Sequence, residues 1–252
     1  MLRGIALIFA LGLASAASAA SMADTRCQAE GGEPVEVVDV DARLELRLAD
    51  GRLLVLAGIE PPAGTLAQEQ LADWLFGKEV VVKALASQPD RWGRLPAIVF
   101  PSGARESAAE ALLRAGLARI RISAPLACLA ALRAAETLAR DNGEGVWAQE
   151  ATVEMDAADL DAFRGRDGAS VVVTGRAVSV ATLGYRTYVN FGPRKYRDFS
   201  ITILKPSLKI FDKAGLSVQS LSGHQLRVRG MLDMQFGPQI EIASPDAIEI
   251  LD

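Results

Sequence analysis

The sequence predicts a mainly β protein with α-helical additions, built from two five-stranded barrels of the oligonucleotide-binding (OB) type. Two observations support this fold class. Short runs of alternating apolar and polar residues, typical of half-buried strands, recur in both halves of the chain. Each half also shows the order strand-strand-strand-helix-strand-strand of a small OB barrel. The length of 252 residues, 50% of them hydrophobic, suits two such domains.

The first domain is expected over residues 27–149. Leucine and valine alternate with polar residues from Val35 to Leu56, and Asp50-Gly51 marks a hairpin turn inside this segment. Three later segments have helical apolar spacing and end at a glycine signal, and two short apolar runs are typical of strands. The expected helices are 66–76, 104–115 and 126–140, and the expected strands are 80–82 and 96–100.

A linker with a short helix is expected at residues 150–167, which are rich in Ala and Asp. Beyond it, residues 168–252 are predicted to form a second, OB-like domain. Its expected strands are 171–179, 185–191, 199–204, 225–231 and 239–243, with a helix at 207–214 and a last short run at 247–251.

The N-terminus has the pattern of a signal peptide over residues 1–20. A positive start is followed by an apolar run from Ile5 to Leu13 and by the small-residue cleavage site Ala17-Ser18-Ala19. The run is short for a bilayer span, so a retained single-span anchor is the weaker alternative. We therefore expect a periplasmic or secreted protein without a membrane segment after cleavage. The formal net charge of −4 argues against a surface wrapped in nucleic acid.

The chain contains two cysteines, Cys27 and Cys128. An oxidising compartment favours a disulfide between them. Two unpaired thiols are the alternative, and a catalytic cysteine has little support because the sole histidine, His224, lies in the other domain. We expect His224 to be a solvent-facing turn residue, since it has no partner cysteine or histidine.

Four segments of the first domain resemble the staphylococcal-nuclease-like (thermonuclease) family. They are LADGRLLVLAGIEPP at 48–62, DRWGRLPAIVF at 90–100, AEALLRAGLARI at 109–120 and AAETLARDNGEGVW at 134–147. The resemblance covers residues 35–148 and implies an OB barrel with helices. It also implies a calcium-dependent phosphodiesterase ancestry. In that family two aspartates bind the metal, a glutamate handles the attacking water and two arginines neutralise the phosphate.

The resemblance places the phosphate-binding and water-handling residues at three positions. Arg94 matches the second arginine of the family. Val55 stands where the family has its first arginine, and Ala63 stands where it has its glutamate. Loss of a general base costs about 10²–10⁴-fold in rate, and loss of one preorganised charge costs on the order of 10²–10³-fold. The resemblance therefore implies a degenerate site with little or no catalysis.

The resemblance also implies the metal ligands. Glu60 occupies the position of one metal aspartate. The other falls on Asp41 or on Leu44, depending on how the first hairpin is aligned, and Asp41 is slightly favoured. Glu69, near the start of the following helix, is a candidate substitute carboxylate. Calcium is the expected cofactor if the domain is catalytic, because a hard cation needs several charged oxygens. Alternatively, these charged residues are surface residues whose ion pairs contribute little.

The second domain contains a segment in which aromatic and basic residues alternate, GYRTYVNFGPRKYRDF at 184–199. The residues from 160 to 252 include 12 Lys or Arg and 9 Asp or Glu, a local charge of +3. Rings interleaved with cations suit single-stranded nucleic acid or another polyanion. Alternating aromatics in a strand are also ordinary core residues, and that interpretation has nearly equal weight. The candidate contact residues are Tyr185, Arg186, Tyr188, Arg194, Lys195, Tyr196 and Arg197.

Three functions remain open at this point. The leading one is an exported, nuclease-like protein that binds nucleic acid or an envelope partner without efficient turnover. The second is a weak calcium-dependent nuclease that uses Asp41, Glu60 and Arg94. The third is a structural or protein-interaction role in the envelope with an unknown protein partner. The Tyr-Val-Asn-Phe-Gly block at 188–192 resembles accessory OB-like domains that follow thermonuclease domains in some exported bacterial proteins.

Overall fold

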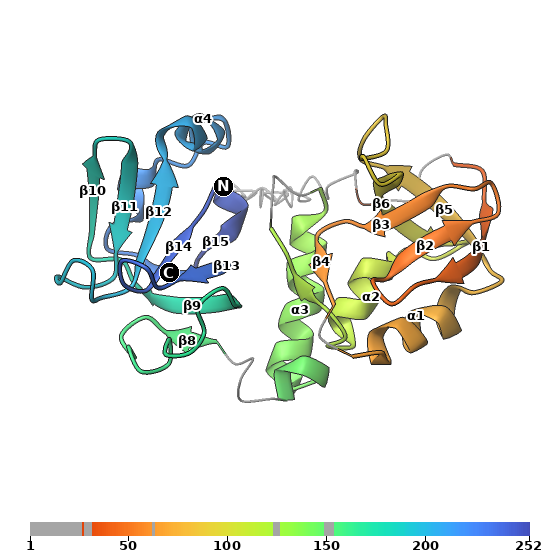
Figure 1. Ribbon diagram of the computed structural model, residues 1–252, viewed down its shortest axis with the longest axis horizontal. Coiled ribbons are helices and arrows are strands. Elements are labelled where there is room, and N and C mark those ends of the chain that lie inside the picture. Colours follow the sequence, from red (N-terminus) through yellow and green to blue (C-terminus); the bar gives the residue numbers. More distant parts are fainter. Residues whose placement is uncertain (1–26, 28–31, 62–63, 123–126, 149–153) are drawn as a thin grey trace, which may run out of the picture.

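The protein consists of two domains that lie side by side, with helix α3 (Leu129–Asn142) between them (Figure 1). The structure is a computed structural model, and it describes residue 27 and residues 32–61, 64–122, 127–148 and 154–252. The signal peptide expected at residues 1–20 lies outside the described residues. Within the described ranges, none of the helices combines the length and the hydrophobicity that crossing a bilayer requires.

The first domain is a closed five-stranded barrel, as the alternating pattern predicts. Going round the barrel, the strands follow the order β1-β2-β3-β6-β5. A short ribbon, β4 with β7, extends from it. The strands are β1 (Val35–Val40), β2 (Glu45–Leu48), β3 (Leu53–Leu56), β4 (Ile59–Glu60), β5 (Glu79–Ala84), β6 (Arg94–Pro101) and β7 (Arg119–Ile120).

Leucine and valine side chains from alternate strand positions fill this barrel. Leu46 of β2 pairs with Leu54 of β3, and Val37 of β1 pairs with Leu48 of β2; all four side chains are buried. The hairpin turn expected at Asp50-Gly51 joins β2 to β3, and Gly51 has a φ of 88°, which glycine adopts without steric cost. Because the interior is filled by side chains, any functional site must lie on the outside or in the loops.

Three helices cover the barrel: α1 (Leu66–Leu75), α2 (Ala108–Arg114) and α3. The second helix begins four residues later than its apolar spacing predicts. Its start is set by a capping box in which the Ser107 hydroxyl accepts the backbone N–H of Glu110 and the Glu110 carboxylate accepts the N–H of Ser107. These contacts satisfy N–H groups that a helix start leaves without partners.

The predicted disulfide between Cys27 and Cys128 is confirmed. It closes a loop of 101 residues and ties the segment before β1 to the start of α3. Cys128 is buried and packs with Ile98 and Phe100 of β6, on the outer side of the barrel. The bridge therefore joins the start of the first domain to the N-terminal end of α3 across β6.

The second domain is an eight-stranded sheet, which differs from the five-stranded barrel expected. Its order is β10-β11-β12-β14-β13-β9-β8, and β15 also pairs with β13. The strands are β8 (Met155–Asp156), β9 (Ser170–Arg176), β10 (Ser179–Leu183), β11 (Arg186–Asn190), β12 (Ser200–Leu204), β13 (Gln225–Asp233), β14 (Gln239–Glu241) and β15 (Ile248–Ile250). Helix α4 (Lys205–Lys213) follows β12, in the expected place.

Two local features account for the additional strands. The run expected as one strand at 171–179 divides at buried Ala177, so that β9 pairs with β13 while β10 pairs with β11. The stretch expected as a linker also contributes to the sheet, because Met155 pairs with Val173 of β9 and the fully buried Phe163 stacks on Phe199. Met155, Ala157 and Phe163 therefore belong to the core of the second domain.

The two domains are joined through one face of α3. Ala139 of α3 packs with Trp147, which follows the helix, and with Val172 of β9. On the same helix, Glu136 forms an ion pair with Arg229 of β13, with 2.8 Å between Oε2 and Nη2. Apolar packing and buried charge thus hold the second domain against the first.

Candidate functional site

Arg94, the matched arginine of the first domain, is held by two carboxylates of its own barrel. Its guanidinium donates to Oδ2 of Asp90 at 2.8 Å and to Oε1 of Glu45 at 3.2 Å. The hydrogen bond from Arg94 holds the pKa of Asp90 below its usual value, and Asp90 followed by Glu45 raises the pKa of Arg94. Asp90 also accepts the backbone N–H groups of Trp92 and Arg94, so it closes the turn before β6.

Asp41, the favoured metal ligand, closes the turn between β1 and β2 in the same way. Its Oδ1 accepts the backbone N–H groups of Arg43 at 2.8 Å and of Glu45 at 2.9 Å. Leu44, the alternative position in the alignment, is a buried apolar residue with a φ of 60°. A leucine side chain supplies no oxygen ligand, so only Asp41 of these two could contribute to a metal site.

Glu60 lies on the β4–β7 ribbon. Its Oε1 accepts a hydrogen bond from Arg119 of β7 at 3.1 Å. The same residue lines a cleft of about 260 Å³ between the domains, together with Arg121 and with Met231 and Ile242 of the second domain. Glu60 therefore faces the second domain, and its charge is met by an arginine of the first.

The candidate carboxylates do not come together. Glu69 is exposed on the first turn of α1. Among the residues that the structure describes, no three His, Cys, Asp or Glu residues lie close enough to hold a metal ion. Calcium requires 6–8 oxygen ligands, and Asp41, Glu60 and Glu69 do not fit such a site. Ala63 lies outside the described residues.

Glu45 is the charged residue of this region that sequence reasoning missed. It is buried on β2, where it faces Val55 of β3 across the barrel strands. Arg43 also forms an ion pair with Glu45, with 3.4 Å between its Nε and Oε1 of Glu45. Leu44, Leu46 and Leu48 mark the inward face of this segment, so Glu45 falls on the outward face and the alternating pattern gives no sign that it is buried. Only the pairing of β3 with β6, which places Arg94 nearby, could have indicated its burial.

The fold and these positions define the first domain as a nuclease-type OB barrel. The family model described as "Staphylococcal nuclease homologue" matches residues 39–149. Residues 39–149 thus form a staphylococcal-nuclease-like domain. A search of curated proteins found no match to the chain.

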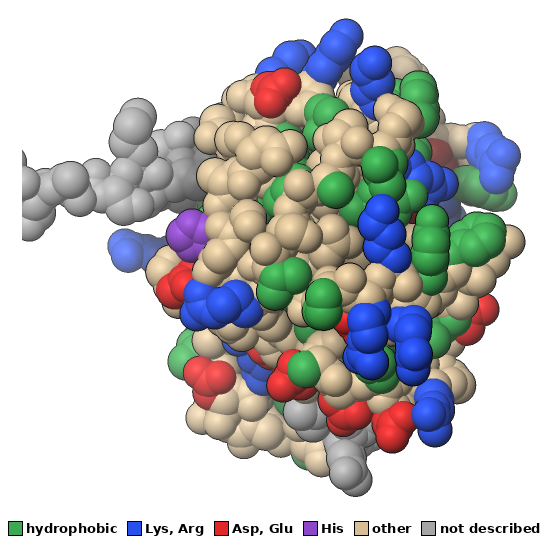
Figure 2. Space-filling view, turned by 90° about the vertical axis from the view of Figure 1, so that its left-hand side faces the viewer, with side chains coloured by type: hydrophobic (Ala, Val, Ile, Leu, Met, Phe, Trp, Pro, Cys, Tyr) green, Lys and Arg blue, Asp and Glu red, His purple; other side chains and the backbone are tan. Residues whose placement is uncertain are grey.

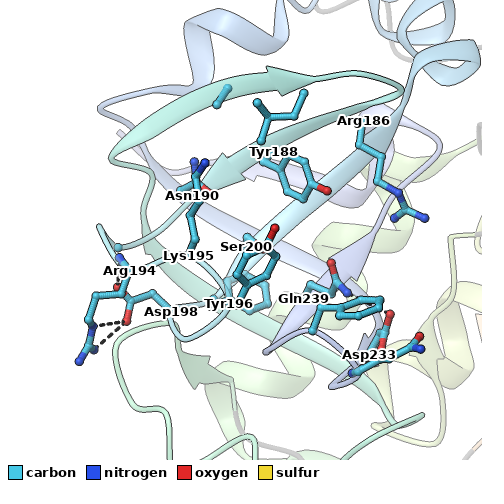
Figure 3. A pocket seen from close by; sticks show the side chains of 16 residues that line it. Arg186, Tyr188, Asn190, Arg194, Lys195, Tyr196, Asp198, Ser200, Asp233 and Gln239 are labelled. Carbon is cyan, nitrogen blue, oxygen red and sulfur yellow. Dashed lines mark hydrogen bonds and ion pairs between the residues drawn. The ribbon is translucent and has the colours of Figure 1, made fainter.

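The second domain carries a groove of about 360 Å³ on the outer face of β10, β11, β12 and β14 (Figure 3). Arg186, Tyr188 and Asn190 alternate along β11 with the buried Thr187 and Val189, so the first three face the groove. The loop after β11 contributes Arg194, Lys195 and Tyr196. Five of the seven residues expected to contact nucleic acid are therefore brought together at one site.

The two remaining candidates, Tyr185 and Arg197, lie outside the set of groove-lining residues. Tyr185 is 62% exposed in the turn between β10 and β11, and Tyr196 is 70% exposed. Tyr188 is half-buried. The core interpretation of the aromatics holds for Phe199, which is fully buried, whereas the tyrosines keep access to solvent. Sequence reasoning missed Phe236 and Gln239, which reach the groove from a different segment of the chain.

The solitary histidine has a structural partner. Nδ1 of His224 lies 3.0 Å from Oδ1 of Asp252, and its side chain is 44% exposed. This placement agrees with the solvent-facing turn expected.

Proposed function

We propose that this protein binds single-stranded nucleic acid through the groove of its second domain, and that its nuclease-like barrel is a non-catalytic scaffold. The observation that carries the proposal is the gathering of Tyr188, Tyr196 and Phe236 with basic residues on one solvent-accessible sheet face. Aromatic faces stack on bases and contribute roughly 1–3 kcal/mol per base, while cations meet the backbone.

The geometry of the first domain supports the second half of the proposal. A phosphodiesterase of this family type needs carboxylates that share a metal and arginines that are free to meet the phosphate. Here Asp41 is used in a turn, Glu60 pairs with Arg119, and Arg94 pairs with two carboxylates. With Val55 in place of the first arginine, no preorganised cation remains at that position to stabilise charge on phosphorus.

Export to the periplasm or the exterior is part of the same proposal. It is supported by the disulfide, which persists in oxidising compartments, and by the signal-peptide pattern of residues 1–20.

Binding can be tested by fluorescence anisotropy with labelled single-stranded DNA and RNA of roughly 12 nucleotides. Saturable binding of the single strands, weaker binding of the same sequence as a duplex, and loss of affinity in Tyr188→Ala support the proposal. Equal binding of single strand and duplex, or no binding of either, contradicts it.

Catalysis is tested separately with a fluorescence-quenched DNA substrate in millimolar calcium. We expect no turnover above that of an Arg94→Ala variant. Calcium-dependent cleavage that is abolished by Glu60→Ala or Arg94→Ala would establish the weak nuclease instead. Binding of an envelope protein with no affinity for oligonucleotides would favour the interaction role.

A further inference from the structure

Tyr196 is held in a backbone conformation that is unfavourable for a side-chain-bearing residue. Its φ is 61°, in the left-handed region, and its side chain is 70% exposed. A non-glycine residue in this region is sterically disfavoured, because its Cβ lies too close to the following carbonyl oxygen. An aromatic ring with so much exposure recovers little of that cost by packing. Strain of this kind gathers at ligand clamps, where the surrounding structure maintains it.

The loop around Tyr196 is braced from two sides. Asp198 accepts the backbone N–H of Arg194 at 2.8 Å and its guanidinium at 2.7 and 3.0 Å. On the other side, the backbone of Tyr196 packs so closely against Gly237 that a Cβ there would lie 2.4 Å from the Tyr196 carbonyl oxygen. These contacts fix the position of Tyr196 relative to Phe236, the residue before Gly237.

The groove therefore has two exposed rings above a polar floor. Phe236 is 62% exposed, and it lines the groove with Tyr196. The floor is formed by Asn190, Ser200 and Gln239, which carry amide and hydroxyl groups and no charge. Tyr188, Tyr196, Ser200 and Gln239 surround one common space (Figure 3). Amides and hydroxyls both donate and accept hydrogen bonds, as the edges of nucleobases require.

The basic residues of the groove are largely neutralised by neighbouring carboxylates. Arg194 turns away from the centre of the groove to meet Asp198, and Arg186 pairs with Glu241 at 3.0 Å. Among the residues that line the groove, three basic side chains (Arg186, Arg194 and Lys195) stand against two acidic ones (Asp198 and Asp233), a net charge of +1. Figure 2 looks onto this domain and shows basic and hydrophobic side chains interspersed, without a continuous basic surface.

We infer that the groove recognises nucleic acid by its unpaired bases rather than by its phosphates. Tyr196 and Phe236 are the stacking surfaces. The amide nitrogens of Asn190 and Gln239 donate to Ser179 and Asp233, so their carbonyl oxygens are the groups that meet the base edges. This inference rests on the proposed function and narrows its ligand to single strands whose bases are free and turned toward the protein.

The decisive comparison is between a single-stranded oligonucleotide and an abasic oligonucleotide of equal length and charge, both measured by anisotropy with the full chain. We expect the abasic strand to bind at least 10-fold more weakly. We also expect a shallow salt dependence, with log K falling with log [salt] at a slope of roughly −0.7 to −1.4, as for one or two phosphate contacts.

Single substitutions test whether the two rings contribute to binding. Tyr196→Leu keeps an L residue in the strained position but removes the ring, and we expect a loss of roughly 5- to 150-fold in affinity. Phe236→Leu should act similarly, and Tyr196→Phe should restore binding. The matched control is Tyr185→Ala, an equally exposed tyrosine outside the groove lining, which should leave affinity within about twofold.

Two results would overturn the inference in distinguishable ways. Equal binding of the abasic strand with a slope steeper than about −3 would leave the proposed function standing but assign recognition to phosphates. Absence of binding to every oligonucleotide would overturn the proposed function and this inference together.

Discussion

Glu136 of α3 and Arg229 of β13 form a buried ion pair that joins the two domains. Their side chains are 1% and 5% exposed, and Nη2 of Arg229 lies 2.8 Å from Oε2 of Glu136. Glu136 also accepts the backbone N–H of Ile120 at 2.7 Å, and Arg229 also contacts Glu249 of β15 at 3.0 Å. Burial alone would lower the pKa of Arg229, but Glu136 and then Glu249 outweigh it and raise that pKa. Arg229 therefore stays charged in the interior.

Removing one partner of this pair should destabilise the whole protein. Glu136→Ala leaves Arg229 buried without its closest carboxylate, and it leaves the Ile120 N–H without an acceptor. We expect a loss of about 3–5 kcal/mol in the free energy of unfolding, measured by urea denaturation. The control is Glu106→Ala, which breaks an exposed ion pair with Arg114 and should change stability by less than about 1 kcal/mol. Equal effects of the two substitutions would contradict the structural role of the buried pair.

The same interface should make stability depend on pH. Burial by itself would raise the pKa of Glu249, but Arg229 and Arg133 outweigh burial, so its pKa lies below the ordinary value of 4.5. A carboxylate with a lowered folded-state pKa stabilises the fold fully above its unfolded value, and it loses that contribution as the pH falls through the folded value. Glu249→Gln should therefore be less stable than the wild type near neutral pH, and the difference should narrow below about pH 4.5. If the difference in the free energy of unfolding between Glu249→Gln and the wild type were the same at every pH across that range, this prediction would be contradicted.

Replacing the strained tyrosine should separate stability from binding. In Tyr196→Gly the left-handed backbone becomes unstrained, while the more flexible unfolded chain offsets part of the gain. We expect a change between zero and about 1 kcal/mol of stabilisation, together with loss of oligonucleotide affinity. Thermal unfolding and anisotropy on the same preparation provide the measurement. A clear loss of stability would show that the ring is needed for packing.

The disulfide should contribute strongly to the stability of the first domain. It closes a loop of 101 residues, and constraining the unfolded chain over such a loop is worth about 4–5 kcal/mol in a chain-entropy treatment. The double variant Cys27→Ala, Cys128→Ala should unfold at lower denaturant concentration than the oxidised protein. Reduction of the wild type should produce a similar shift and should leave the double variant unchanged. Insensitivity of the wild type to reductant would contradict the prediction.

Local signals were sufficient for the first barrel. Alternating apolar residues from Val35 to Leu56 predicted its first three strands, and the turn at Asp50-Gly51 predicted the hairpin of β2 and β3. They were less reliable for the second sheet, where the pattern over 171–179 does not reveal the division at Ala177. Short strands such as β8, with two residues, have no periodicity to detect.

The candidate site, like the fold, was predicted from the sequence only in part. The sequence indicated which segment of the second domain carries the exposed aromatics, because rings and cations alternate at 184–199. It did not indicate that Phe236 and Gln239 complete the groove, since they come from a loop and strand some forty residues away. Nor did it show that Asp41, Glu60 and Arg94 each have an internal partner.

The sequence alone indicated the main strands and helices of the first barrel, favoured the pairing of the two cysteines, and fixed the residue types that stand at the nuclease positions. These features depend on short-range periodicity, on turn and capping residues, and on the presence of two cysteines in the chain. Tertiary structure decided which carboxylate meets which guanidinium: Arg94 with Glu45, Arg119 with Glu60, and Arg229 with Glu136. A charged side chain pairs with an opposite charge that the fold brings within about 4 Å. The partners in these pairs are 49 to 93 positions apart, so the sequence around each residue does not predict which partner it will meet.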